Sequence, residues 1–175
     1  PAGISYYNLS TGNIYYCKTR DGFRGLNVAN TSYITNANGM MTYSNSNFGV
    51  LIMDGSNITM RYLKSNNNDH SGLAVLGGKV VIYNSGFKSN IYFGIYCSTF
   101  GYALVVNNNT VNANGSHGFI TDYCGLAFGG NTSTNAYTNN GGWGAYCDSG
   151  ATGTGFGVAT YSGNVSGTYS ANTAT

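Results

Sequence analysis

The feature that most constrains this chain is a pair of residues that recurs at nearly constant spacing. In six places an acidic or amide side chain stands four positions before a glycine that opens a short apolar stretch. The pairs are Asp21 with Gly25, Asn45 with Gly49, Asn68 with Gly72, Asn90 with Gly94, Asn114 with Gly118 and Asn140 with Gly144. Successive glycines lie 24, 23, 22, 24 and 26 residues apart. A period of this length predicts a stack of similar structural units.

The residues after each glycine alternate in the way that a β-strand requires. In Val50-Leu51-Ile52 and Ile95-Tyr96-Cys97 the first and third members are apolar, and in other repeats they are apolar or small. Alternation directs these two toward a core and the middle member outward. A second apolar strand follows about ten residues later, as at Ile58–Met60 and, in the last repeat, Phe156–Val158. A weaker third strand precedes the amide, as at Tyr62–Lys64.

Three short strands in each repeat, separated by Asn, Gly and Ser turns, predict an all-β fold. We expect residues 1–175 to form one single-stranded parallel β-helix of about seven coils, with residues 163–175 as a terminal strand or tail. The coils open near Gly3, Gly25, Gly49, Gly72, Gly94, Gly118 and Gly144. An antiparallel β-sandwich is the second possibility. The fixed glycine register over six repeats argues against it.

The repeated pattern of Asn, two or three residues, Gly and apolar-x-apolar resembles the pectate-lyase-like superfamily. It is most similar to the short carbohydrate-associated repeats of that superfamily, and the resemblance covers roughly Gly3 to Val158. The resemblance implies a right-handed parallel β-helix. It leaves function open, since the superfamily includes lyases, hydrolases, epimerases, phage tailspikes, adhesins and structural proteins.

Stacked coils lie about 4.8 Å apart, so equivalent side chains should form a column. An amide both donates and accepts, so each Asn can bond to the next along the stack. We therefore expect a structural ladder of Asp21, Asn45, Asn68, Asn90, Asn114 and Asn140. Asp21 should break the amide column, because a carboxylate only accepts. A row of sugar-binding or ion-binding amides is the alternative interpretation.

Composition narrows the classes of partner. Only 7% of the residues are charged and the net charge is +2, so no basic stripe suited to nucleic acid is present. No stretch approaches the roughly 20 apolar residues of a membrane span. No motif for a metal or another cofactor appears, and we expect neither. The chain starts at Pro1 without a signal peptide, so we expect a processed product or a fragment.

Carboxylates are too few to favour catalysis. Asp122 and Asp148 both fall four residues after their glycine, so they could lie one coil spacing apart. That spacing suits a retaining glycosidase, but two solvated turn residues would look the same. Asp69 and His70, in a turn that follows Arg61 and Lys64, are the other candidates for acid–base chemistry. We expect no enzyme, and if there is one, a polysaccharide lyase or glycoside hydrolase.

Aromatic residues offer a better candidate for binding. The residue before each glycine is Phe48, Phe93 or Trp143 in three repeats, and Tyr96 and Tyr146 are predicted to face outward. These five side chains could stack on sugar rings or on another protomer.

The cysteines and the N-glycosylation sequons lead to two further predictions. The disulfide candidates are Cys17, Cys97, Cys124 and Cys147; Cys97 and Cys147 should lie two coils apart, too far for a bond. A bridge from Cys124 to either of them, an interchain bond of Cys17 and buried free thiols all stay open. The N-glycosylation sequons begin at Asn8, Asn30, Asn57, Asn108, Asn114, Asn131 and Asn164.

No capping segment is evident at either end of the repeats, and uncapped coils with low charge favour head-to-tail stacking. We therefore expect an extracellular or cell-surface structural protein that self-assembles into a filament or layer, with copies of itself as its partner. The alternative is a polysaccharide-binding or receptor-binding β-helix, like a tailspike or adhesin.

Overall fold

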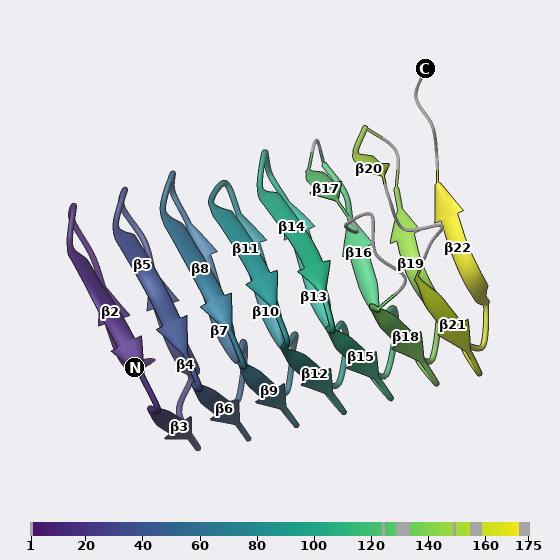
Figure 1. The fold of residues 1–175 in the computed structure, drawn as a ribbon, viewed down its shortest axis with the longest axis horizontal. Coiled ribbons are helices and arrows are strands. Elements are labelled where there is room, and N and C mark those ends of the chain that lie inside the picture. The colour runs from purple at the N-terminus through teal and green to yellow at the C-terminus, as the bar shows by residue number, and fades with distance from the viewer. Residues whose placement is uncertain (1, 124, 129–133, 149, 155–158, 172–175) are drawn as a thin grey trace.

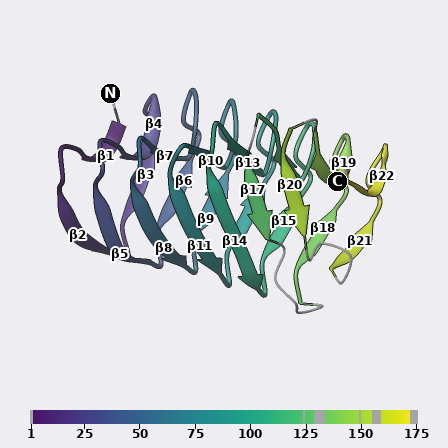
Figure 2. The same ribbon diagram turned by 90° about the horizontal axis from the view of Figure 1, so that it is seen from above.

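The computed structural model describes residues 2–123, 125–128, 134–148, 150–154 and 159–171. Within these residues the chain forms strands and no helix, and the strands stack into three parallel sheets. Each coil contributes one strand to each sheet, and seven coils follow one another along a straight axis (Figures 1 and 2). The predicted parallel β-solenoid is confirmed, and the antiparallel sandwich is excluded.

The three sheets are named here in the order in which the chain enters them. Sheet A consists of β1 (Ala2–Tyr6), β4 (Arg24–Val28), β7 (Val50–Met53), β10 (Leu73–Leu76), β13 (Ile95–Ser98), β16 (Phe119–Thr121), β19 (Trp143–Cys147) and β22 (Gly167–Ala171). Sheet B consists of β2 (Thr11–Tyr15), β5 (Tyr33–Asn38), β8 (Asn57–Arg61), β11 (Lys79–Tyr83), β14 (Tyr102–Asn107), β17 (Leu126–Phe128) and β20 (Thr152–Thr154). Sheet C consists of β3 (Lys18–Arg20), β6 (Met41–Tyr43), β9 (Lys64–Asn66), β12 (Gly86–Lys88), β15 (Thr110–Asn112), β18 (Ala136–Thr138) and β21 (Thr160–Ser162).

One strand prediction needs correction, and another falls on residues that the structure does not describe. The third strand of the third coil is β9 at Lys64–Asn66, two residues later than Tyr62–Lys64. Tyr62 has a φ of 54° and forms the corner between sheets B and C, so it cannot belong to an extended strand. The predicted trace Phe156–Val158 lies outside the described residues, and the last strand of sheet B is β20.

The core fills the inside of the coils with columns of equivalent residues. In sheet A, Leu73 pairs with Val50 on one side and Ile95 on the other, and all three are fully buried. The first and third residues after each glycine therefore face inward, as the alternation predicts. Sheet C changes along the axis: Thr42 donates a hydrogen bond to Ser65 at 2.7 Å, whereas Phe87 and later inward residues are apolar or aromatic.

The predicted amide ladder runs along the corner between sheets C and A. Each Nδ2 donates to the Oδ1 of the next coil, from Asn45 to Asn68 at 2.8 Å through to Asn140 and Asn164 at 2.9 Å. The intermediate links are Asn68 to Asn90, Asn90 to Asn114 and Asn114 to Asn140, at 2.9 to 3.0 Å. Each Oδ1 also accepts the backbone N–H of the preceding coil, for example Asn90 N–H at 3.1 Å. The ladder therefore satisfies buried backbone and side-chain groups together.

Asp21 does not belong to this ladder, which corrects the predicted first rung. Gly22 takes the position instead, because its N–H donates to Asn45 Oδ1 at 3.3 Å. The corner of the first coil is one residue shorter than the others, so the four-residue spacing to Gly25 points to the wrong residue. Asp21 is exposed and its carboxylate lies 3.5 Å from the Arg20 guanidinium.

The recurrent glycines are required by packing, because the space of a side chain is already occupied. A Cβ on Gly94 would lie 2.2 Å from Val111 Cγ1, 2.6 Å from Gly118 O and 2.9 Å from Asn114 Nδ2. The amide of the next coil occupies the same place beside Gly49, Gly72, Gly118 and Gly144. The recurring Asn and Gly therefore fit together between coils: each glycine makes room for the ladder amide one coil ahead.

A second, shorter ladder was not predicted. At the corner between sheets B and C, Asn109 Nδ2 donates to Asn135 Oδ1 at 3.1 Å, and Asn109 Oδ1 accepts the N–H of Ser85 at 2.9 Å. Both amides are fully buried. Ser85 replaces the amide in the fourth coil, so the sequence shows no repeat at this position.

We expect Gly94→Ala to lower the free energy of unfolding by about 3 kcal/mol, since the new methyl group overlaps a side chain and a backbone carbonyl. Gly86→Ala is the matched control, because its Cβ would meet nothing closer than Thr110 Oγ1 at 3.4 Å. This control should stay within about 0.5 kcal/mol of the parent chain. Urea unfolding of both variants measures the difference, and equal stabilities would contradict the packing role of the column.

Candidate functional site

A row of interacting aromatic rings lies outside the core along sheet A. We call it the aromatic strip; its members come from the third to the seventh coil. They are Phe48, His70, Tyr92, Phe93, Tyr96, His117, Trp143 and Tyr146. Some precede the glycine of a coil, whereas Tyr96 and Tyr146 occupy the outward position of β13 and β19. All five predicted aromatic binding residues are members.

The rings of the strip contact one another continuously from coil to coil. His70 lies 4.6 Å from Phe48 and 4.9 Å from Tyr92, measured between ring centroids. Phe93 continues the row to Tyr96 at 5.5 Å. Further along, His117 lies between two partners, stacked on Phe93 at 5.9 Å and on Tyr146 at 5.0 Å. Trp143 completes the strip at 6.5 Å from Tyr146.

The strip is an exposed surface on a buried support. Tyr92 is 50% exposed, and the other rings are partly exposed. The outward residues Leu51, Ala74 and Ile120 are buried although they lie outside the interior cluster. Phe93 at the corner contacts outward Tyr96, so the rings of the strip extend onto the outer face of sheet A. The sheet therefore has apolar layers on both faces.

His117 fixes the far end of the strip. The backbone N–H of Trp143 donates to His117 Nδ1 at 2.9 Å, so this nitrogen must be unprotonated and the neutral ring carries its proton on Nε2. Burial lowers the pKa of His117, and the negative charge of Asp148 opposes this effect. Burial also lowers the pKa of His70, whose Nδ1 lies 2.9 Å from Ser71 Oγ. The strip therefore favours neutral imidazoles.

Two of the candidate carboxylates lie at the border of the strip. Tyr96 donates its hydroxyl proton to Asp122 Oδ2 at 3.3 Å, while Asp122 Oδ1 is shielded from solvent without a hydrogen-bond partner. Burial is the main cause that raises the pKa of Tyr96. The backbone N–H of Asp148 bonds to Thr121 O at 2.9 Å, which places Asp148 in the coil after Asp122, as its spacing predicts. The described residues hold no cluster of three metal-ligating side chains.

The structure separates the other candidates for acid–base chemistry. Asp69 is exposed at a turn, and its neighbour His70 belongs to the strip between Phe48 and Tyr92. Arg61 lies over the ring of Tyr83 at the end of β11, with 4.2 Å between its Cζ and the ring centroid. Lys64 is exposed at the start of β9 in sheet C. The turn therefore does not gather these groups into one site.

Cys17 and Cys97 form no disulfide among the described residues. Cys97 and Cys147 are buried in one column with Thr121 between them, as the two-coil separation predicts. Burial raises the pKa of Cys97 to about 12. Cys17 is partly exposed and its Sγ lies 3.3 Å from Tyr15 O. Cys124, and with it any bridge from Cys124 to Cys97 or Cys147, lies outside the described residues.

The asparagines of the sequons differ in how far their side chains are buried. Asn114 is a buried rung of the ladder, and Asn164 accepts from Asn140 and donates to Tyr137 O, so the folded chain offers neither amide for glycosylation. Asn8, Asn30 and Asn108 are exposed, and Asn57 is partly exposed. Asn131 lies outside the described residues.

No helix among the described residues is long and apolar enough to cross a membrane. No protein-family model, curated protein or solved structure matches this chain.

The free energy of unfolding should fall as the pH is lowered from about 7.5 to about 5, because unfolded histidines take up protons before the folded ones do. The pKa values of His70 and His117 are lower in the folded chain than the ordinary value of 6.5. The neutral imidazoles therefore stabilise the folded state in full only above about pH 6.5, and this stabilisation is lost as the pH falls. Chemical denaturation at several pH values measures it. His70→Gln/His117→Gln should flatten the dependence, and an unchanged profile in this variant would contradict the assignment.

Proposed function

We propose that this chain is a non-enzymatic, extracellular glycan-binding β-solenoid, and that the aromatic strip is its binding surface. One observation carries the proposal: partly exposed rings form an unbroken series across five coils of a rigid sheet. Sugars present apolar C–H faces that pack on aromatic rings. An extended polysaccharide lying along the axis would meet successive rings at the coil spacing.

The chemistry of the strip favours a neutral glycan. Lysine and arginine are absent from the strip, and its two imidazoles are held in the neutral form by burial. The Asp122 carboxylate and the Tyr96 hydroxyl border the rings and supply hydrogen-bonding groups for sugar hydroxyls. An acidic polysaccharide would be repelled by the Asp122 carboxylate, and the strip contains no lysine or arginine to offset the repulsion.

The likeness of the repeat to the pectate-lyase-like superfamily also supports a carbohydrate ligand. We propose membership of that superfamily on the shared Asn-to-Gly spacing and on the three-strand coil. Catalysis is not part of the proposal, because Asp122 and Asp148 have no basic residue close to them in the sequence.

Trp143, the only tryptophan of the chain, reports on the strip directly. Titration with soluble neutral polysaccharides such as hydroxyethylcellulose and xylan should change its fluorescence. Tyr92→Ala should weaken binding about threefold to tenfold, the effect expected for the loss of one aromatic contact. Affinity electrophoresis in gels that contain each polysaccharide gives an independent measurement.

Tyr33→Ala is the matched control, since Tyr33 is a tyrosine of the same 50% exposure that lies on sheet B. It should bind like the parent chain. Equal losses of affinity for Tyr92→Ala and Tyr33→Ala, or polysaccharide binding without a change in Trp143 fluorescence, would show that the aromatic strip is not the binding surface.

A second candidate function is head-to-tail self-assembly into a filament or surface layer. Its specific support is the distribution of charge along the axis. All seven cations and three of the five carboxylates lie in residues 1–88, which gives that half a net charge of +4 and the other half −2. Opposite ends of two copies therefore attract each other. Among the described strands, β1, β2 and β3 are terminal in their sheets and pair on one side only.

Negative-stain electron microscopy at low salt should show fibres one solenoid wide, and fibres should shorten above about 0.5 M salt as the charges are screened. A folded domain fused to the N-terminus should block growth at that end. Discrete particles at every concentration and salt would rule out this second function and leave glycan binding untouched.

A further inference from the structure

The corner between sheets B and C carries exposed rings that the fold does not explain. Tyr16 and Tyr62 occupy equivalent corner positions, with φ values of 49° and 54°. Side chains with a Cβ are disfavoured in this left-handed conformation, which suits Gly and Asn. Gly39, Asn84 and Asn108 occupy the same position in the other coils with described corners. Yet Tyr16 is 82% exposed and Tyr62 is 57% exposed, so little burial offsets the strain.

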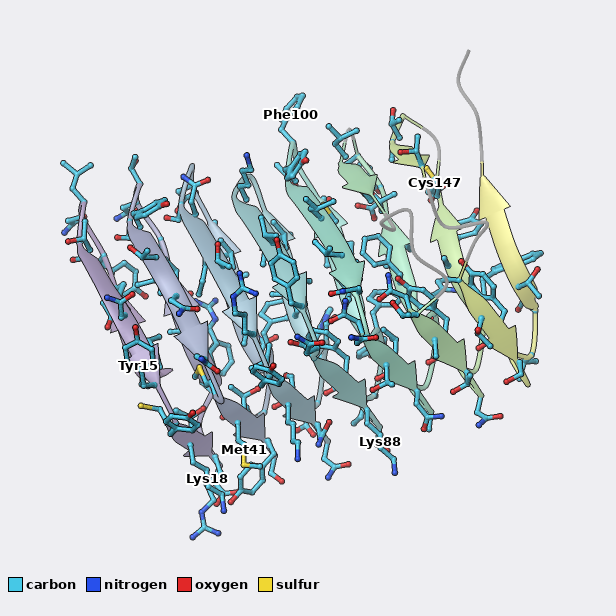
Figure 3. All side chains as sticks on the ribbon, viewed as in Figure 1. Tyr15, Lys18, Met41, Lys88, Phe100 and Cys147 are labelled. Carbon is cyan, nitrogen blue, oxygen red and sulfur yellow. The ribbon has the colours of Figure 1, made fainter. Side chains whose placement is uncertain are left out.

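Lysines lie next to these tyrosines on the outer face of sheet C. Lys18, Met41 and Lys64 form one column, since Lys18 pairs with Met41 and Met41 with Lys64. On β12 this column continues to Gly86, and Lys88 lies in the neighbouring outward column, paired with Asn66. Lys18, Met41, Lys64 and Lys88 are all exposed. Figure 3 shows Lys18, Met41 and Lys88 along the lower edge of the solenoid. The alternate residues of these strands, such as Thr42 and Ser65, are buried, so the lysines face solvent by the alternation of the strand.

The outer face also contains a depression that two lysines flank. It is lined by Lys18, Met41, Tyr43, Lys64 and Asn66, among others. The Lys18 ammonium group lies 4.9 Å from the centre of the Tyr43 ring, which holds it over this depression. The nearest carboxylates in sequence, Asp21 and Asp69, belong to the opposite corner of sheet C, where Asp21 pairs with Arg20. The depression therefore suits a phosphate group.

We propose that this surface, formed by Tyr16, Tyr62, Met41, Lys18, Lys64 and Lys88, binds an anionic lipid bilayer peripherally. Lysine ammonium groups attract anionic headgroups, and tyrosine rings settle at the boundary between headgroups and acyl chains. Met41, 37% exposed between two lysines, meets an apolar phase there. A linear polyanion accounts for the surface less well, because the second coil presents Met41 in place of a cation and no lysine or arginine follows Lys88.

The surface is separate from the aromatic strip, so the two functions can be tested in one chain. Sedimentation of the full chain with phosphatidylcholine vesicles, with and without about 30% phosphatidylglycerol, measures the partition coefficient. Anionic vesicles should bind at least about tenfold more strongly than neutral ones. Combined Lys18→Gln, Lys64→Gln and Lys88→Gln should lower this partition roughly a hundredfold, about fivefold for each lysine. Lys79→Gln on sheet B is the control and should stay within about twofold.

The tyrosines are tested by substitutions that the corner tolerates. Tyr16→Asn/Tyr62→Asn places at both positions the residue found at 84 and 108, so the fold should be retained while vesicle binding falls about tenfold. Phe100→Asn is the matched control, because Phe100 is 78% exposed with a φ of 61° at the corner between sheets A and B. It should bind vesicles like the parent chain.

Three results would overturn the proposal: equal partition onto neutral and anionic vesicles, equal losses for Lys79→Gln and for the combined variant of Lys18, Lys64 and Lys88, or binding to soluble heparin without vesicle binding. The last result would assign the surface to a linear polyanion. The change in Trp143 fluorescence on adding glycan, measured on the same variants, reports separately on the aromatic strip. Glycan binding and bilayer binding are therefore tested independently of each other.

Discussion

Parallel hydrogen bonding between successive coils is the constraint on which the rest of the structure depends. Because each strand pairs in register with its equivalent one coil ahead, every side chain lies beside its counterpart at a spacing of about 4.8 Å. A residue is therefore selected by how well it tolerates similar neighbours in the adjacent coils. Amides satisfy this by donating on one side and accepting on the other, as Asn68 and Asn90 do. Aromatic rings satisfy it by stacking, as Tyr137 and Tyr161 do.

The period of the glycines was sufficient to predict the solenoid. The same packing leaves no room for a Cβ in each coil, so a glycine recurs in the sequence once per coil. Sheet C was harder to predict. Its strands have three residues with one inward member, so a segment such as Lys18–Arg20 carries almost no apolar signal. The third strand of the third coil was predicted two residues too early, because the apolar pair Tyr62 and Leu63 resembles the start of a strand but forms the corner before it. The shorter ladder at Asn109 and Asn135 was missed because Ser85 interrupts it.

The aromatic strip was predicted only in part. The rings that precede the glycines, such as Phe93 and Trp143, could be recognised because the glycine fixes their register. His70 and Tyr92 lie two residues before a glycine, where nothing in the sequence distinguishes a ring of the strip from an exposed turn residue. The outer column of sheet A was expected to face solvent, and it does face away from the core. Leu51 and Ala74 are nevertheless buried, which the alternation of a single strand cannot show.

The fit between each glycine and the amide of the next coil has a consequence for how such a chain can change during evolution. Gly72 and Asn90 are 18 residues apart in sequence, yet one leaves the room that the other fills. Substitutions at these positions should therefore be inherited together, and residues within one repeat should be less strongly correlated. A chain of this kind can grow by duplicating a segment that runs from one glycine to the equivalent glycine of the next coil. The period itself then records how the molecule was lengthened.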